Sequence, residues 1–395
     1  MSLLPGATLG VMGGGQLGRM FVQAAQAMGY FTAVLDPDPT SPAGMVAHYH
    51  IQTDYVDEQG LAQLMQRSDA ITTEFENVPA AALLTLGSHR PTAPAADAVA
   101  VCQDRALEKA QFKRCGVPCA PHAVIDSASR IDAMDDALLP GILKTNRLGY
   151  DGKGQLAVAD REALRRAWMA LGQVSCVLEK RLPLRCELSV IVARSAMGEV
   201  VSLPVQQNLH RHGILAVTQV PAPDVSAQLQ QQAIDAATRL AHSMGYVGVL
   251  CVEFFVVEGE GEGEGEALVA NEMAPRPHNS GHYSIDACDL SQFDLQVRAL
   301  AGLPLPTPRQ HSPALMLNLL GELWFGQGDV PRMPDWSAVL ALPGVHLHLY
   351  AKLGARRGRK MGHLTVTAAR PEQVRAVAQQ AAALLGLDPG LVDGR

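Results

Sequence analysis

Two glutamates in the middle third of the chain have residue types and positions that suit a metal site. Glu253 shares one face of a predicted strand, residues 246–257, with Val249 and Cys251, where an unpaired carboxylate would be costly to bury. Glu272 stands at the end of a predicted returning strand over residues 267–271 and shares a face with Leu268 and Ala270. If these strands pair, the two carboxylates converge and repel unless a proton or cation lies between them. Oxygen ligands near phosphates favour Mg²⁺, so we expect a magnesium site; two surface glutamates are the alternative.

A glycine-rich hairpin is the second candidate. Lys144 ends one predicted strand, residues 141–144, and the next strand begins at Gln155. Between them lie three glycines and Lys153, in an order that is not a Walker P-loop. Such a hairpin can fold over a triphosphate, offering backbone N–H groups and a mobile cation. An ordinary β-hairpin turn is the alternative.

Two further polar segments are candidates for an anion site. Residues 271–282 carry Arg276, His278 and His282 in a loop marked by proline and glycine. Residues 350–363 carry Lys352 and the basic run 356–360. Basic residues of this kind can bind a phosphate, although a solvated charged surface is the usual interpretation of such a run.

The segment Gly13–Gly18 follows an apolar run and precedes a helical pattern, with Asp36 about 18 residues further on. Glycines at this position let the backbone approach a phosphate at a helix N-terminus. The motif alone leaves three interpretations open: a dinucleotide, another phosphate ligand, or a structural turn.

The elements that position these residues change character along the chain. A strand, glycine turn, helix and strand, followed by another strand over residues 70–73, predict an N-terminal α/β domain with a doubly wound parallel sheet. A helix over residues 104–114 follows, and then short strands and a helix over residues 227–244. Prolines from residue 304 predict a linker to a smaller C-terminal domain. We expect domains over residues 1–108, 109–302 and 303–395.

Composition excludes several classes of protein. A chain of 395 residues is too long for one core. Its formal charge of -7 argues against a nucleic-acid or membrane-surface binder. Seven scattered cysteines without a CxxC pair, and no signal peptide or transmembrane run, predict a cytoplasmic protein. The Glu-Gly tract 258–266 is expected to be a solvated loop without a catalytic role.

Taken in order, these motifs make the chain resemble the ATP-grasp superfamily and, within it, the N5-carboxyaminoimidazole ribonucleotide synthetase family. The resemblance runs from Gly13 to about His363. Its most specific parts are Gly149-Tyr150-Asp151-Gly152-Lys153-Gly154-Gln155 and His278-Asn279-Ser280-Gly281-His282.

The resemblance implies an α/β fold of three domains: a doubly wound parallel-sheet domain, a central ATP-grasp domain and a small C-terminal domain. It implies that ATP and Mg²⁺ phosphorylate bicarbonate to carboxyphosphate, which carboxylates the amine of 5-aminoimidazole ribonucleotide. It also implies a homodimer. No single residue stands out as a general base, and a mobile cover over the reactive intermediate is expected.

The resemblance also assigns residues to roles. Those implied for ATP are Arg105, Lys144, Gly149, Tyr150, Asp151, Gly152, Lys153, Gly154, Gln155, Glu179, Lys180, Arg181, Leu182, Glu187, His210, Asn271 and Glu272. Among them, residues 179–182 would hold adenine and Glu187 the ribose. Glu253 and Glu272 would hold Mg²⁺, and Arg276, His278 and Lys352 would be catalytic. Those implied for substrate are Gln16, Glu76, Asn208, Asn279, Ser280, Arg359 and Lys360.

Three rival functions remain at this point. A nicotinamide-dependent oxidoreductase would use the glycine turn and Asp36 but leaves the Lys144 hairpin and the carboxylate pair unexplained. Another ATP-grasp ligase, such as a formate-dependent purine transformylase, is closer. A nucleotide-binding regulator without enzymatic activity is the third.

Overall fold

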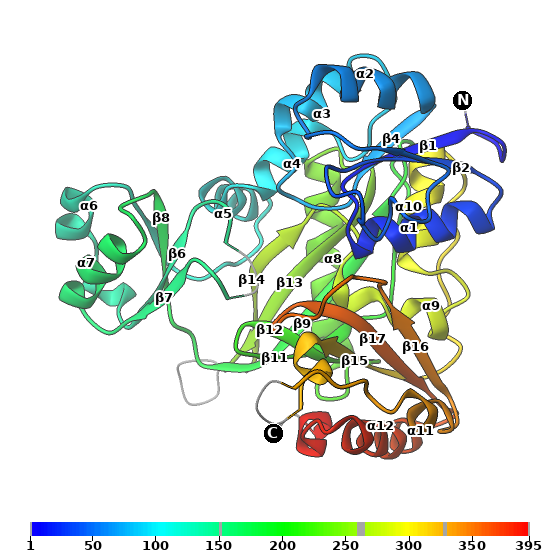
Figure 1. The fold of residues 1–395 in the computed structure, drawn as a ribbon. Helices are drawn as coiled ribbons and strands as arrows, with labels where there is room; N and C mark the ends of the chain where they lie inside the picture. Colours follow the sequence, from blue (N-terminus) through cyan, green and yellow to red (C-terminus); the bar gives the residue numbers. More distant parts are fainter. Residues whose placement is uncertain (1, 150–151, 259–264, 327–329, 394–395) are drawn as a thin grey trace.

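The computed structural model describes residues 2–149, 152–258, 265–326 and 330–393 (Figure 1). Its first unit is a parallel sheet in the order β3-β2-β1-β4. Helices cover both faces, because α1 packs on one apolar face and α2, α3 and α4 on the other. The doubly wound N-terminal sheet is therefore confirmed. Its elements are β1 (Thr8–Met12), α1 (Gln16–Ala27), β2 (Phe31–Leu35), β3 (Tyr49–Ile51), α2 (Glu58–Arg67), β4 (Ala70–Thr73), α3 (Ala80–Gly87) and α4 (Ala96–Cys102).

A small lobe stands apart on the left of Figure 1. It is an antiparallel sheet in the order β5-β8-β6-β7, with α6 and α7 packed on it around its own apolar core. The helix α5 (Arg105–Arg114) leads into it. The other elements of the lobe are β5 (His122–Ile125), α6 (Ala128–Ala133), η1 (Asp136–Leu138), β6 (Gly141–Thr145), β7 (Gln155–Val158), α7 (Arg161–Ala170) and β8 (Cys176–Lys180).

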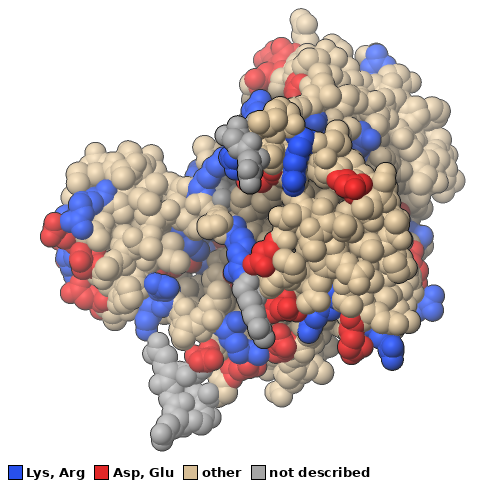
Figure 2. Space-filling view, turned by 60° about the horizontal axis from the view of Figure 1, so that its bottom comes forward, with Lys and Arg blue, Asp and Glu red and all other residues tan. Residues whose placement is uncertain are grey.

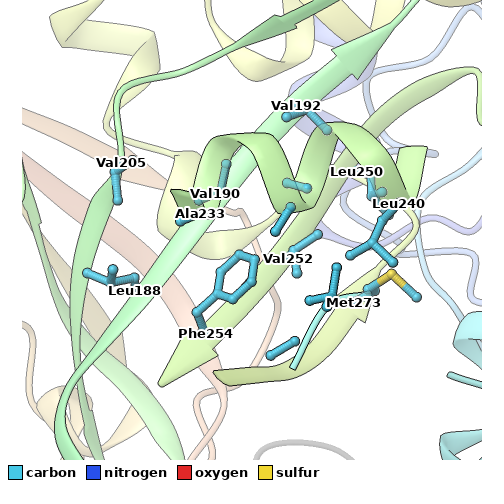
Figure 3. Packing of buried hydrophobic residues seen from close by; sticks show 14 of the residues in the cluster. Leu188, Val190, Val192, Val205, Ala233, Leu240, Leu250, Val252, Phe254 and Met273 are labelled. Carbon is cyan, nitrogen blue, oxygen red and sulfur yellow. The ribbon is translucent and has the colours of Figure 1, made fainter. Parts of the chain in front are cut away.

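The largest sheet has nine strands in the order β14-β13-β9-β11-β12-β15-β17-β16, with β10 paired to β9. The helix α8 (Ala227–Ser243) lies across it and buries Leu240 and Ala233 against Val252, Phe254 and other apolar side chains (Figure 3). Burying each large aliphatic or aromatic side chain contributes about 1.5–3 kcal/mol. The strands are β9 (Leu184–Arg194), β10 (Val200–Ser202), β11 (Gln206–Arg211), β12 (Ile214–Val220), β13 (Gly248–Val257) and β14 (Ala267–Ala274).

The C-terminal segment continues this sheet, although it has its own core. The prolines do form a connection without helix or strand before β15, but β15 then pairs with β12 of the central segment. A cluster that includes Leu317, Leu364 and Leu385 fills the core under α12. The expectation of a separate smaller domain therefore holds for the core and not for the sheet. The elements are β15 (Ala314–Leu320), η3 (Gly321–Trp324), α11 (Trp336–Leu340), β16 (Val345–Leu349), β17 (Lys360–Thr367), α12 (Pro371–Leu385) and η5 (Pro389–Asp393).

One helix, α10 (Gln292–Ala301), joins the N-terminal sheet to the large sheet. It follows η2 (Asn279–Gly281) and α9 (Ser284–Ala287). The buried amide of Gln296 accepts from the backbone N–H of Val249 in β13 at 2.6 Å and donates to the Thr72 hydroxyl in β4 at 2.8 Å. These two bonds tie the two sheets on either side of the cleft described below.

The helices and strands predicted from the sequence agree best with the structure where a capping residue or a glycine marks the end of the element. The helix predicted over 104–114 forms with Asp104 as its N-cap, accepting from the N–H groups of Ala106 and Leu107, and Gly116 beyond its end has φ +63°. The strand predicted over 267–271 was too short, because β14 extends to Ala274 by pairing with Cys251 of β13. Glu272 therefore lies within a strand. In the described residues no helix is long and apolar enough to cross a membrane.

We expect Gln296→Leu to lower the free energy of unfolding by about 2–5 kcal/mol, since it leaves a buried N–H and a buried hydroxyl without a partner. Gln380→Leu, at an exposed position of α12, is the matched control and should change stability by less than about 0.5 kcal/mol. Urea unfolding followed by circular dichroism measures both. Equal stability of the two variants would contradict the bridging role of Gln296.

Candidate active site

The two carboxylates predicted as metal ligands stand directly opposite each other. Glu253 of β13 pairs with Glu272 of β14, and the register shifts at the next residue. Burial, and then the charge of Glu272, raises the pKa of Glu253 to about 8. Burial alone would raise the pKa of Glu272 as well, yet Arg105, 3.1 Å from its carboxylate, and Lys144 lower it. Glu253 Oε1 is buried and accepts no hydrogen bond from the described residues, although His278 Nε2 lies 3.4 Å away, so this oxygen is available as a ligand.

Behind this pair lies a buried ion group centred on Glu179. Its carboxylate is 3.0 Å from Lys109 Nζ and 2.8 Å from Lys144 Nζ, and Lys109 is wholly buried. Both ammonium groups also reach Asn271, Lys109 its backbone oxygen at 2.8 Å and Lys144 its side-chain oxygen at 3.3 Å. Burial opposes ionisation of Glu179 and of Lys144. At Glu179 the two lysines prevail and lower the pKa to about 2, whereas at Lys144 burial prevails and lowers the pKa.

The loop after β14 places a cation and a neutral imidazole beside the carboxylates. Arg276 forms an ion pair with Glu76, which follows β4 of the N-terminal sheet. His278 Nε2 lies 3.4 Å from Glu253 Oε1, and its Nδ1 lies 2.9 Å from the hydroxyl of Ser280. Burial, and then the positive charge of Arg276, holds the pKa of His278 well below its usual value, so the ring is neutral. Within the part of the chain that the structure describes, neither polar atom of the buried Asn279 amide has a hydrogen-bond partner.

Two acidic side chains hold the glycine turn that precedes α1. The N–H of Gly14 donates to Asp36 at 2.6 Å, and Tyr55 donates to the same carboxylate. Glu74 accepts from the N–H of Gly15 at 2.9 Å and of Gly18 at 3.2 Å. A carboxylate thus occupies the amides at the helix N-terminus where a dinucleotide pyrophosphate would bind. This arrangement disfavours the oxidoreductase interpretation.

The C-terminal basic residues come from the loop between β16 and β17. Lys352 Nζ donates to the backbone oxygen of Lys360 at 2.8 Å, and Arg359 donates to the backbone oxygens of Leu353 and Gly354 at 3.0 and 2.9 Å. These bonds fold the loop on itself. The loop and the N-terminal glycine turn line the same cleft.

One cleft of about 850 Å³ collects these groups from all three segments of the chain. Figure 2 shows lysine and arginine side chains along the hollow between the small lobe and the main body. The predicted site residues that line it are Gln16, Glu76, Arg105, Gly149, Lys153, Glu253, Glu272, Arg276, His278, Asn279, Lys352, Arg359 and Lys360. Residues separated by more than 300 positions therefore share one site.

Comparison with known proteins identifies the family to which this arrangement belongs. Residues 6–103 match the ribonucleotide synthetase preATP-grasp domain, 110–293 the ATP-grasp domain, and 314–377 the phosphoribosylaminoimidazole carboxylase C-terminal domain. N5-carboxyaminoimidazole ribonucleotide synthase of Brucella melitensis is 43% identical over 367 residues, covering 92% of this chain and 97% of the relative. The Bacillus subtilis enzyme of the same name is 40% identical, covering 92% of each. This chain belongs to the N5-carboxyaminoimidazole ribonucleotide synthase family.

Solved structures agree with that assignment. A Staphylococcus aureus N5-carboxyaminoimidazole synthetase complexed with ADP superposes with a TM-score of 0.86 at 37% identity, covering 97% of this chain and 98% of that one. An Aspergillus clavatus synthase in complex with ADP and 5-aminoimidazole ribonucleotide gives a TM-score of 0.86 at 30% identity, covering 97% and 100%. The three-domain architecture expected from the sequence is that of this family. The domain limits at residues 108 and 302 fall between the matched segments and stay a proposal.

Other residues implied by the family resemblance are not among those that line the cleft. Glu187 forms an ion pair with His210, and although burial lowers the pKa of that histidine, the hydrogen bond and charge of Glu187 raise it to about 8. The Asn208 amide is buried and bonded to Ser189 and Thr218, and Ser280 supports His278. Tyr150 and Asp151 lie outside the described residues, as does most of the Glu-Gly tract. The other implied site residues that do not line the cleft are Lys144, Gly152, Gly154, Gln155, Glu179, Lys180, Arg181, Leu182 and Asn271.

Several residues that shape the cleft of this chain were not predicted from the sequence. Lys109 completes the ion group around Glu179, and its i,i+4 spacing from Arg105 on α5 was the available signal. Glu74 holds the glycine turn beside Asp36, which the sequence had marked only as part of a dinucleotide motif, and Glu108 accepts from the N–H of Met273, next to Glu272. Burial raises the pKa of Glu108 to about 8. No local pattern marks Glu74 or Glu108, because their partners come from distant segments.

We expect Glu179→Gln to lower the free energy of unfolding by about 3–5 kcal/mol at pH 7, since it leaves two buried ammonium groups without their counter-ion. The pKa of Glu179 is lowered from 4.5 to about 2, so its contribution is present above pH 4.5 and is lost as the pH falls toward 2. The stability gap between wild type and variant should therefore narrow in acid. Chemical unfolding at pH 7 and below pH 4 measures it.

Glu199→Gln, at an exposed position, is the control for this substitution and should change stability by less than about 0.5 kcal/mol at either pH. A gap for Glu179→Gln that stays constant down to the lowest pH at which the protein folds would rule out an ionised Glu179 as the source of the stability.

Proposed function

We propose that this chain carries out the ATP-dependent carboxylation of 5-aminoimidazole ribonucleotide to N5-carboxyaminoimidazole ribonucleotide in de novo purine biosynthesis, with release of ADP and phosphate. The observation that carries the proposal is the single cleft, in which the carboxylate pair, Arg276, His278 and the C-terminal lysines meet within a chain of this family. Bicarbonate is the proposed source of the carboxyl group.

The nucleotide would lie between the small lobe and the large sheet. Arg105 and Lys144 would face its phosphates, and residues 149–155 would cover them. Because the side chain of Glu179 is engaged by two lysines, a contact of residues 179–182 with adenine would be made by backbone groups or by the neighbouring side chains. Glu187 and His210 are proposed for the ribose and phosphate region, where the ion pair fixes both side chains.

The donor set fits Mg²⁺. Glu253 and Glu272 present oxygen ligands on adjacent strands, and one oxygen of Glu253 is buried without a partner. Mg²⁺ prefers oxygen ligands from one or two carboxylates together with phosphates. When bound, the ion would neutralise charge that develops on the transferred phosphoryl group. Arg105 would complement it from the other side of Glu272.

The chemistry proposed for the cleft proceeds in two stages. A bicarbonate oxygen attacks the γ-phosphorus of ATP, and the bond to ADP breaks, which forms carboxyphosphate. Carboxyphosphate then releases CO₂ and phosphate, and the exocyclic amine bonds to CO₂ and loses a proton. Arg276, His278 and Lys352 are proposed beside these species, where donors preorganised for developing negative charge have the largest effect on rate.

The ribonucleotide would be held by residues from both sides of the cleft. Gln16 and Glu76 are proposed from the N-terminal sheet, and Arg359 and Lys360 from the β16–β17 loop. Asn279 lines the cleft with unpaired amide atoms, while Asn208 and Ser280 would act from behind it. A formate-dependent transformylase stays the alternative within the superfamily, and a cytoplasmic homodimer stays the expectation from the resemblance.

ADP release measured with 5-aminoimidazole ribonucleotide, ATP and Mg²⁺ tests the function directly. We expect release to require both the ribonucleotide and bicarbonate, and formate or glycinamide ribonucleotide to be without effect. Absence of ribonucleotide-dependent release in bicarbonate would refute the proposal, and release that depends on formate instead would favour the transformylase.

Glu272→Gln should lower kcat by at least about 100-fold, because it removes a metal ligand and the charge that Arg105 pairs with. Glu199→Gln is the control and should retain wild-type kcat. Steady-state ADP release at saturating ATP measures both, with circular dichroism to establish that the variants fold. Wild-type turnover by Glu272→Gln would contradict the metal role.

Replacing residues 258–266 by a short turn should leave kcat nearly unchanged, since long insertions in surface loops are tolerated. The same ADP-release assay measures this variant, and a large loss of rate would show that the tract contributes to catalysis.

A further inference from the structure

A second cluster of metal-ligating side chains lies beneath the β16–β17 hairpin, outside the catalytic cleft. It consists of Asp286 from α9, His348 from β16 and His363 from β17. One ligand atom from each lies within 4.8 Å of the other two. None of the three lines the cleft, and none has a role in the proposed reaction.

The strands and the helix bring these groups together from different directions. His348 and His363 are opposite each other in the β16–β17 ladder, and their rings stack with centroids 4.5 Å apart. Asp286 places one carboxylate oxygen 2.9 Å from His348 Nε2. Its other oxygen is 3.7 Å from Nδ1 of His346, which pairs across the ladder with Thr365.

His363 is the observation that points to a ligand. The residue is wholly buried, and its Nε2 has no hydrogen-bond partner among the described residues, which costs about 1–3 kcal/mol for a buried polar group. Its Nδ1 lies 2.9 Å from the hydroxyl of Tyr350, a second bond of the kind that orients a metal-bound imidazole. Burial, and then the neighbouring His282 and His348, holds the pKa of His363 well below its usual value, so the ring is neutral.

We propose that Asp286, His348 and His363 bind a divalent transition-metal ion of the Zn²⁺ type. Two imidazoles and a carboxylate form a ligand set that suits Zn²⁺, whereas Mg²⁺ prefers oxygen ligands alone. The ion takes the Nε2 of His363 and lies between His348 Nε2 and the Asp286 carboxylate, which are 2.9 Å apart. His348 is 28% exposed, which gives the ion a path from solvent and a place for a water ligand.

A metal ion at this site would fix the relative positions of two segments that line the catalytic cleft. Asp286 follows the segment 278–282 that carries His278 and Asn279, while His348 and His363 lie at the base of the loop that carries Lys352 and Lys360. The ion would therefore clamp the two sides of the substrate end of the cleft. We expect metal occupancy to lower the KM for the ribonucleotide with little effect on kcat.

Metal titration of the full-length chain tests the site. The chelator-treated protein, held in excess Mg²⁺ to saturate the carboxylate pair, is titrated with Zn²⁺ by calorimetry and with Co²⁺ by visible absorption. We expect one equivalent to bind, with Co²⁺ bands typical of a site with nitrogen ligands and a rise in Tm. The same equivalent should bind to Glu272→Gln, because the two sites share no ligand.

His348→Gln keeps a donor for Asp286 but removes the imidazole, so it should weaken Zn²⁺ binding by roughly 100-fold or more while the protein stays folded. His311→Gln, at an exposed position elsewhere, is the matched control and should bind as wild type. Absence of a Zn²⁺ equivalent in wild type, or unchanged binding by His348→Gln, would overturn the proposal and leave the contact between His348 and Asp286 as the role of the cluster.

Discussion

The repulsion between Glu253 and Glu272 is the constraint around which the site is organised. Antiparallel pairing places the two carboxylates opposite each other, and cationic and polar groups gather around that charge. Arg105 pairs with Glu272 and His278 lies beside Glu253. The arrangement leaves one carboxylate oxygen open, which is where a bound cation would complete the balance.

A second layer of buried charge keeps this first layer in place. Glu179 holds Lys109 and Lys144, and both lysines reach Asn271, the residue before Glu272. Removing one member of a buried ion group costs more free energy than the whole group contributes to stability. Such a group therefore fixes the geometry of its side chains more than it stabilises the fold. The strand β14 is therefore held from behind by α5 and by the small lobe together.

The three segments of the chain contribute different parts of one cleft, because the order of the strands brings these parts together. The N-terminal sheet supplies Glu76, which pairs with Arg276 of the central segment. The C-terminal strands extend the central sheet, so the β16–β17 loop is carried to the same cleft. Gln296 links the two sheets through paired buried groups. A movement of one segment would therefore change its contacts with the other two.

Local patterns in the sequence are enough to predict most of the helices and strands and the residue types of the site. Alternation along residues 246–257 places Glu253 on a buried face, and the glycine and histidine motifs indicate the family. The pairing of the buried charges depends on the folded chain, because Lys109, Glu74 and Glu108 meet partners from distant segments. It also decided that β15 joins the central sheet and that His348 meets Asp286. Such contacts depend on strand order and packing, which no local spacing encodes.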